Sequence, residues 1–187
     1  MRARERIAEA GLTSEIDVVE AAIEKLPFAD SSFDWIWCRD VLVHVDARRG
    51  LAECARVLRP GGALLAYVTL ATDRLEPREA EELVAALALR RGSIELARLE
   101  AAAVEAGLVL RSVELLGSEW RERMIEDEKW DVAQDLLHVA RLRRQKPELV
   151  ERYGATAVDA AAYGLSWGAY QLLGKLCPTV YVWERRA

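Results

Sequence analysis

The chain has 187 residues, of which 52% are hydrophobic and 30% are charged, and its formal net charge is −5. This composition is typical of one folded globular domain and argues against a disordered or fibrous chain. The negative charge also argues against a nucleic-acid-binding protein, because such proteins present a basic surface to the phosphate backbone.

The first 32 residues predict a helix, a strand and a turn. Residues 1–10 are charged with helical spacing, Gly11 is placed to end the helix, and no apolar run is long enough for a signal peptide. Residues 16–23 are rich in β-branched side chains and predict a strand, whereas residues 26–32 carry the proline, aspartate and serine of a turn.

The middle of the chain predicts alternating strands and helices. Residues 33–40 form a short apolar run that predicts a strand, and residues 41–58 have helical spacing that stops at Pro60. Residues 62–70 are continuously apolar, which indicates a central strand covered on both faces. Two helices are expected next, over residues 77–89 and 94–106.

A strand at residues 108–117 precedes a helical insertion, residues 118–177, expected as two helices separated near Gly154. Residues 178–186 predict a final strand, and no apolar stretch is uninterrupted enough to span a bilayer. The alternation predicts an α/β fold with a mostly parallel sheet between helices. Ligands of such sheets bind beyond the carboxyl ends of the strands, here after Ala21 and after Cys38.

Three motifs carry a resemblance to a known family. The segments LPFADSSFD, RVLRPGG and LEAAAVEAGLVLRSVEL occur in this order at residues 26–34, 56–62 and 99–115. In order and spacing they resemble the class I S-adenosylmethionine-dependent methyltransferases. The resemblance covers nearly the whole chain and implies a single Rossmann-like domain over residues 1–187.

The resemblance implies a sheet with strand order 3-2-1-4-5-7-6, whose last strand is antiparallel and lies between the fifth and sixth. Residues 1–11 would be the helix after the second strand, residues 16–21 the third strand, and residues 33–39 the fourth. Residues 62–70 would be the fifth strand, and residues 178–186 the antiparallel last one.

In this alignment the chain begins after the family's first strand, its glycine-rich loop and its second strand. No GxGxG segment occurs in the sequence. In the family that loop approaches the methionine part of the cofactor, and an acidic residue at the end of the second strand holds the ribose. The sequence therefore predicts a methyltransferase fold that lacks its N-terminal cofactor segment.

The resemblance implies S-adenosylmethionine as the cofactor and a cofactor-binding rim made of Ala22, Ile23, Glu24, Cys38 and Arg39. At the place of Ala22 the family often has an aspartate that accepts a hydrogen bond from the adenine amino group. The backbone and side chain of Ile23, with Glu24 nearby, remain as support for the adenine.

Asp40 and His44 follow the predicted fourth strand and are the candidate catalytic residues. Histidine is suited to accept a proton near neutral pH. Alternatively, His44 packs under the following helix and bonds a backbone carbonyl. Methyl transfer from a sulfonium needs little acid–base chemistry, because holding donor and acceptor together in a dry site supplies most of the acceleration. Asp34, at the start of the strand, is interpreted as structural.

The helical insertion is expected to cover the substrate site. An aromatic lining would suit a small organic acceptor that is apolar or aromatic, although core packing explains most of the rings equally well. We expect one or two of the insertion's aromatic residues to contact substrate: Trp120, Trp130, Tyr163, Trp167 and Tyr170.

The cysteines and histidines predict no disulfide and no metal site. Cys38, Cys54 and Cys177 are far apart without CxxC spacing, which is typical of reduced thiols in a cytoplasmic protein. With only His44 and His138 and no cysteine pair, the sequence offers no zinc ligand set.

Three functional hypotheses follow. The leading one is methyl transfer from S-adenosylmethionine to a small organic molecule, with no nucleic acid or membrane span involved. The second is a non-catalytic remnant or scaffold of the same fold that pairs with a partner chain, such as a second copy in a homodimer, because the fourth strand has an exposed edge. A doubly wound domain for another nucleotide cofactor is third, and no fingerprint loop supports it.

Overall fold

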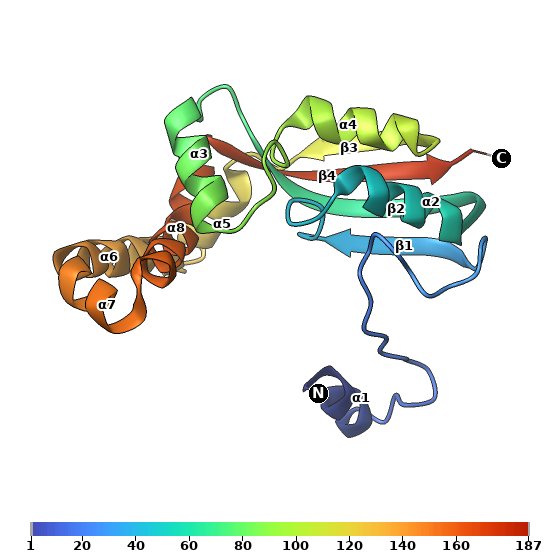
Figure 1. The fold of residues 1–187 in the computed structure, drawn as a ribbon, viewed down its shortest axis with the longest axis horizontal. Coiled ribbons are helices and arrows are strands. Elements are labelled where there is room, and N and C mark those ends of the chain that lie inside the picture. Colours follow the sequence, from blue (N-terminus) through green and yellow to red (C-terminus); the bar gives the residue numbers. More distant parts are fainter. Residues whose placement is uncertain (1, 187) are drawn as a thin grey trace.

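A four-stranded mixed sheet forms the centre of the molecule, which is described here by a computed structural model of residues 2–186 (Figure 1). The strands are β1 (Phe33–Arg39), β2 (Leu58–Ala71), β3 (Leu108–Leu115) and β4 (Leu176–Arg185), in the spatial order β1-β2-β4-β3. β1 pairs with β2 in parallel, whereas β4 runs antiparallel to both of its neighbours. The predicted antiparallel last strand, inserted between the two strands before it, is confirmed.

Two helices, α2 (Ala47–Val57) and α4 (Leu96–Glu105), cover one face of this sheet, and α3 (Pro77–Ala86) lies at the end of the sheet against α8 (Ala155–Leu172). Their apolar side chains form one core with alternate residues of the strands, since successive residues of a strand point to opposite faces. The largest fully buried side chains of β4 in that core are Trp183 and Tyr181, whose rings stack with centroids 4.4 Å apart.

The helix expected at residues 41–58 is shorter than predicted and begins at Ala47, where the Asp46 side chain accepts a hydrogen bond from the Arg49 backbone N–H. Residues 41–46 instead form turns after Asp40, whose φ of +54° is incompatible with a helix. The helix ends at Val57 and β2 starts at once, ahead of the proline.

The insertion between β3 and β4 contains four helices, where two were predicted: α5 (Glu119–Glu126), α6 (Asp131–Arg144), α7 (Lys146–Tyr153) and α8 (Ala155–Leu172). The expected break at Gly154 is confirmed, and its φ of +84° favours glycine. The further break before α7 coincides with Pro147 in the first turn of that helix. Within residues 2–186 no helix has the length and apolarity that crossing a membrane requires.

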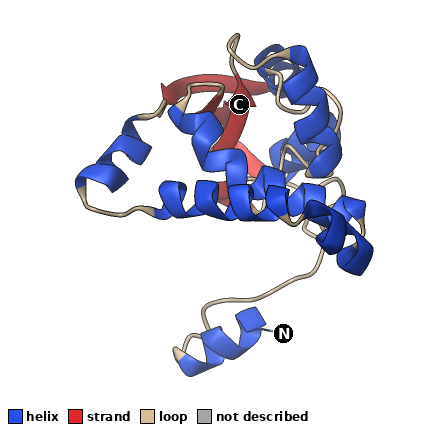
Figure 2. Cartoon of the chain, turned by 90° about the vertical axis from the view of Figure 1, so that its left-hand side faces the viewer, coloured by secondary structure: helices blue, strands red, loops and turns tan. Residues whose placement is uncertain are grey.

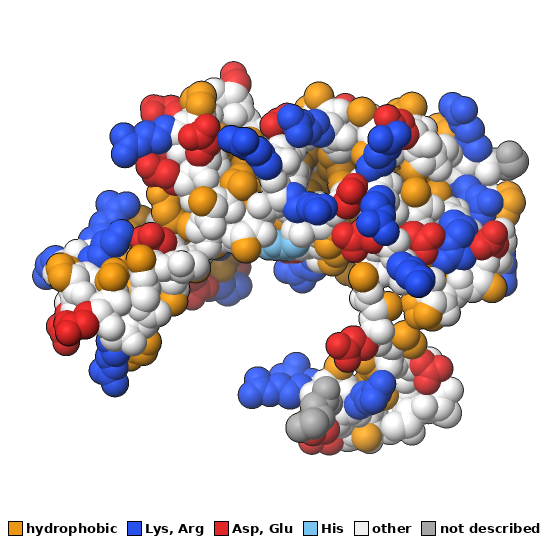
Figure 3. Space-filling model, in the orientation of Figure 1, with side chains coloured by type: hydrophobic (Ala, Val, Ile, Leu, Met, Phe, Trp, Pro, Cys, Tyr) orange, Lys and Arg blue, Asp and Glu red, His pale blue; other side chains and the backbone are white. Residues whose placement is uncertain are grey.

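The strand predicted at residues 16–23 is wrong. After α1 (Arg2–Glu9) the chain runs as an irregular, mostly exposed connection to β1, with only an isolated bridge between Ala22 and Lys25. Figures 1 and 2 both show α1 away from the sheet, and the space-filling view shows it as a separate lobe (Figure 3). A segment of β-branched residues forms a strand only where a neighbouring strand can hydrogen-bond to it. No described residue forms such a strand beside residues 16–23.

The second face of the sheet is open over β1. Trp35 and Trp37 project from that face and are 68% and 57% exposed, because α2 and α4, which cover the sheet, lie on the opposite side. Among residues 2–186, β1 has a strand neighbour on one edge only. This edge and face are therefore available to another backbone and another apolar surface.

Arg56 fastens the loop before β1 to the end of α2. Its guanidinium donates to the carbonyl oxygens of Leu26 (3.0 Å) and Phe28 (2.8 Å) and to the carboxylate of Asp30 (2.7 Å). It also donates to Glu53, whose carboxylate accepts the Leu26 backbone N–H at 2.8 Å. Hydrogen bonds thus join the motifs at residues 26–34 and 56–62 into one cluster, and this cluster orders residues 26–30.

Arg59, the second arginine of the motif at residues 56–62, binds a carboxylate at the surface. Arg59 forms an ion pair of 2.6 Å with Asp34, and both side chains are more than half exposed. The side chain of Asp34 thus faces solvent and binds Arg59, and its structural role stays a prediction. Exposed pairs of this kind contribute little to stability because water screens them.

We predict that Arg56→Ala destabilises the chain about three times as much as Arg59→Ala, because it leaves several partly buried oxygens without a donor. Urea denaturation of the two variants, followed by circular dichroism, measures the difference in unfolding free energy. Equal losses would contradict the role assigned to Arg56.

The difference in unfolding free energy between the parent chain and Arg56→Ala should depend on pH. Hydrogen bonds from Arg56 and from the Leu26 N–H lower the pKa of Glu53 from 4.5 to about 2. A carboxylate with a depressed pKa stabilises the fold above its unfolded pKa, and this contribution is lost as the pH falls through the folded value. The stability gap between the parent chain and Arg56→Ala should therefore shrink between pH 4.5 and 2.

Candidate functional site

Two cavities flank the carboxyl end of β1. The first, the apolar cavity, has a volume of about 460 Å³ and is lined by β1, by the loop before it and by α2. The second, the polar cavity, has a volume of about 390 Å³ and lies between the ends of β1 and β2 and the helices α5, α6 and α8. Cys38 lines the first cavity and its neighbour Arg39 lines the second, and successive residues of a strand point to opposite faces, so the two cavities lie on opposite sides of this end of the strand.

Ile23 and Cys38, two of the predicted cofactor residues, line the apolar cavity. Ile23 is half-buried against Gly50, where a Cβ would lie only 3.3 Å from the isoleucine side chain. Cys38 is buried, and this burial raises the pKa of its thiol to about 11. The thiol therefore stays protonated near neutral pH and acts as an apolar contact.

Ala22, Glu24 and Arg39 do not line the apolar cavity. Ala22 is exposed in a tight turn closed by the hydrogen bond from the Lys25 N–H to the Ala22 carbonyl (3.0 Å). The Glu24 carboxylate accepts the Asp46 backbone N–H at 3.2 Å, and its own backbone N–H and that of Asp46 lower the pKa of this carboxyl. Glu24 thereby holds the turn against the start of α2, whereas Arg39 lines the polar cavity.

The two predicted catalytic residues, Asp40 and His44, both line the polar cavity. Asp40 donates its backbone N–H to the Tyr67 carbonyl (3.0 Å), and burial raises the pKa of its carboxyl, opposed by the nearby Arg39 and His44. The His44 side chain is exposed and its ring bonds no described residue within 2–186. The alternative that His44 is packed under the helix and bonded to a carbonyl is therefore wrong.

Two of the five insertion aromatics, Trp120 and Trp167, line the polar cavity. Trp130 is exposed, and the other two rings lie in a separate groove. Sequence reasoning missed Tyr67, at the end of β2, and two polar residues of the helices, Arg121 and Gln171, which also line the cavity. Gln171 could have been noticed in the sequence, because it is a polar residue within the most apolar helical stretch of the chain.

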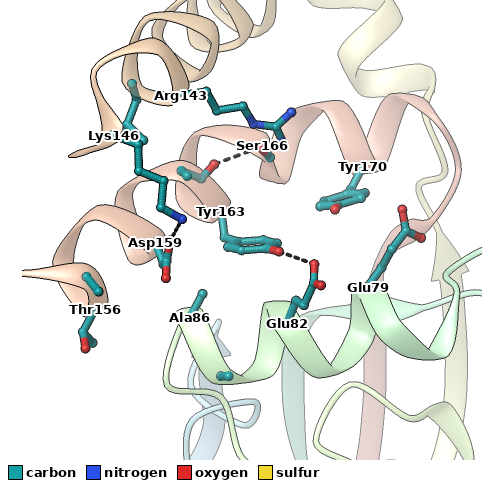
Figure 4. Close-up of a pocket in the computed structure, with 14 residues that line it drawn as sticks. Glu79, Glu82, Ala86, Arg143, Lys146, Thr156, Asp159, Tyr163, Ser166 and Tyr170 are labelled. Carbon is teal, nitrogen blue, oxygen red and sulfur yellow. Dashed lines mark hydrogen bonds and ion pairs between the residues drawn. The ribbon is translucent and has the colours of Figure 1, made fainter. Parts of the chain in front are cut away.

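The separate groove, of about 680 Å³, lies between α3 and α8 (Figure 4). Its polar groups are largely paired with one another: the Tyr163 hydroxyl donates to Glu82 at 2.5 Å, and Lys146 binds Asp159 at 2.8 Å. The bond to Glu82 raises the pKa of Tyr163 to about 12, so this hydroxyl stays protonated. We interpret the groove as a seam of helix packing, since its polar groups satisfy one another.

Within the part of the chain that the structure describes, no group of three or more His, Cys, Asp or Glu side chains is arranged to hold a metal ion. The free thiols of Cys38 and Cys54 are buried in the core, and Cys177 is half-buried.

Comparison with known proteins supports the motif resemblance. Residues 1–66 match the sequence profile of the family described as methyltransferase domain. A dimethylglycine N-methyltransferase of Parasynechococcus marenigrum is 38% identical over 76 residues, a stretch that is 40% of this chain and 27% of that relative. The match thus spans about a quarter of the relative's length.

Two solved structures share the fold. The [4+2]-cyclase SpnF superposes with a TM-score of 0.67 over 99% of this chain and 61% of its own, at 22% identity. Phosphoethanolamine N-methyltransferase 2 of Haemonchus contortus, solved with phosphomonomethylethanolamine and S-adenosylhomocysteine, superposes with a TM-score of 0.66 over 99% of this chain and 40% of its own, at 18% identity. The predicted α/β fold is confirmed.

The backbone of Asp40 gives a prediction for the polar cavity. A positive φ is unfavourable for residues with a Cβ and free for glycine, and here it turns the chain from β1 into the cavity wall. We expect Asp40→Ala to be less stable than Asp40→Gly by about 1 kcal/mol. Urea denaturation of both variants tests this, and equal stability would show that the turn is not strained.

Proposed function

We propose that this chain, whose residues 1–66 match the profile described as methyltransferase domain, transfers a methyl group from S-adenosylmethionine to a small organic acceptor with an apolar or aromatic part. The observation that carries the proposal is the pair of cavities that both reach the end of β1. One is suited to a flat apolar ring and the other to a small polar or aromatic molecule. The carboxyl end of a parallel strand is where α/β sheets bind their ligands.

The apolar cavity fits the adenine end of the cofactor. Its lining is made of aliphatic and aromatic side chains, among them Ile23, with the turn of Ala22 and Glu24 beside it. Among the described residues its lining holds no carboxylate for the ribose, so we assign only the adenine end to this chain. When bound, S-adenosylmethionine supplies an electrophilic methyl group on a sulfonium.

The polar cavity would hold the acceptor. Trp120, Trp167 and Tyr67 offer aromatic surface to its apolar part and exclude water from it. Asp40 and His44 face the same space and are placed to take the proton that the acceptor atom loses. Helices α5, α6 and α8 supply much of this wall, which supports the expectation that residues 118–177 cover the substrate.

A second candidate function is a non-catalytic subunit of the same fold. The free edge of β1 and the exposed Trp35 and Trp37 favour it, since they offer pairing and apolar contact to a partner chain or a second copy. In that case the folded chain on its own would bind no S-adenosylhomocysteine. Both candidates assume a cytoplasmic protein.

We predict that the 187-residue chain binds S-adenosylhomocysteine in the micromolar range and that Ile23→Asp weakens this binding about tenfold, because it places a charge in the apolar cavity. Ile16→Asp, on the exposed connection after α1, is the matched control and should bind like the parent chain. Isothermal calorimetry measures all three. Absence of heat from protein shown to be folded would favour the second candidate.

We further predict that His44→Ala lowers kcat about tenfold for an acceptor identified from a panel of small aromatic amines and phenols. His138→Ala, the other histidine of the chain and exposed on α6, should leave kcat unchanged. Mass-spectrometric detection of S-adenosylhomocysteine formation gives the rates. An equal effect of the two substitutions would remove His44 from the mechanism.

A further inference from the structure

Arg121, on α5, lines the polar cavity without an anionic partner. Its Nε donates to the Gln171 side-chain oxygen at 2.9 Å, and its Nη1 makes only a weak contact of 3.9 Å with the Met124 sulfur. Among residues 2–186 no carboxylate oxygen lies within 4.0 Å of the Arg121 guanidinium nitrogens, in contrast to those of Arg39, Arg56 and Arg59. A guanidinium has five N–H donors, so most of those of Arg121 are left for a ligand.

Three neighbours fix the guanidinium in place. Gln171, only 1% exposed, directs its amide oxygen at Nε. The guanidinium carbon lies 3.8 Å from the centroid of the Trp120 ring. A Cβ at Gly168 would come within 3.3 Å of that carbon, so the absence of a side chain there leaves it room. A flexible side chain that is held in this way loses little entropy when it binds.

The surrounding charges do not neutralise Arg121. Burial lowers the pKa of Arg121, opposed from a distance by Tyr67, by Asp135, which also lines the cavity, and by Asp131. The guanidinium nevertheless remains protonated near neutral pH, as arginine does throughout proteins. On the strand side of the cavity, Arg39 lies 3.8 Å from Asp40. Arg121, on the helix side of the cavity, therefore has less negative charge close to it than Arg39 has.

A second donor on the same wall also lacks an acceptor. The indole Nε1 of Trp120 is buried, and no described residue in 2–186 accepts its hydrogen. An unpartnered buried donor is costly. Because this nitrogen is closed to solvent, it does not face the cavity, and the guanidinium of Arg121 is the donor on this wall that a bound anion would meet.

We propose that Arg121, held against the Trp120 ring, forms an anion subsite that binds a carboxylate or phosphate group of the acceptor molecule. This inference rests on the proposed function for the identity of the cavity as the acceptor site. It deepens that function, because it adds an anionic head to an acceptor with an apolar or aromatic part. Binding the head against α5 turns the rest of the acceptor toward Asp40 and His44 at the end of β1.

Three probes with the same 2-phenylethyl body test the subsite without any methyl donor: 3-phenylpropanoate, 2-phenylethyl phosphate and 3-phenylpropanamide. Titration into the 15N-labelled full chain, followed by the indole N–H resonance of Trp120, gives their dissociation constants. Trp120→Phe identifies that resonance among the six tryptophans. At least one anion should bind about tenfold or more tightly than the amide, and the stronger of the two shows whether the head is a carboxylate or a phosphate.

The preference for the anion should disappear in Arg121→Gln and survive in part in Arg121→Lys, which keeps the charge but not the planar fork. Arg123→Gln, an exposed arginine of the same helix, is the control and should keep the full preference. Retention of one fold by all variants is checked by circular dichroism, and Arg121→Lys carries the test if the glutamine variant unfolds.

Equal binding of the amide and both anions, or an anion preference that survives in Arg121→Gln, would overturn the subsite. Failure of the subsite is distinct from failure of the proposed function. A chain that binds S-adenosylhomocysteine without preferring anionic probes loses only the subsite. A chain that prefers anions through Arg121 but binds no S-adenosylhomocysteine keeps the subsite and loses methyl transfer.

Discussion

The hydrogen bonds of Arg56 are the interaction on which the candidate site depends most. They tie residues 26–30, which have no strand or helix of their own, to the end of α2. Glu53 on the same helix accepts the Leu26 backbone N–H. Side chains of α2 therefore bind both a backbone donor and backbone acceptors of the loop. The chain before residue 22 has few such contacts and lies away from the sheet, whereas the segment next to β1 is held where a ligand would need it.

The division of roles follows from the position of this loop. It closes the apolar cavity on one side of the end of β1, while α5, α6 and α8 form most of the wall of the polar cavity on the other. Adjacent residues of one strand end, Cys38 and Arg39, therefore belong to different cavities. A donor bound in one cavity would reach an acceptor in the other past the end of the strand, and methyl transfer by direct displacement requires that contact.

Much of the fold could be predicted from the sequence, because the motifs at residues 26–34 and 56–62 fix its centre and the antiparallel last strand follows from the resemblance. The strand at 16–23 could not, because its formation depends on a neighbouring strand rather than on its own residues. Asp40 and His44 were predicted to follow the strand, and both line one cavity at the end of β1, whereas their catalytic role stays a prediction. Arg121 and Gln171 were missed, since only tertiary packing brings α5 and α8 to the end of β1.

Hydrogen–deuterium exchange of the full chain, with and without saturating S-adenosylhomocysteine, tests the central claim most directly, because it reports where the ligand binds. The two-cavity arrangement predicts slower exchange at residues 22–26 and 38–41, on the two sides of the end of β1. Protection confined to the groove between α3 and α8, or none despite measurable binding, would contradict it.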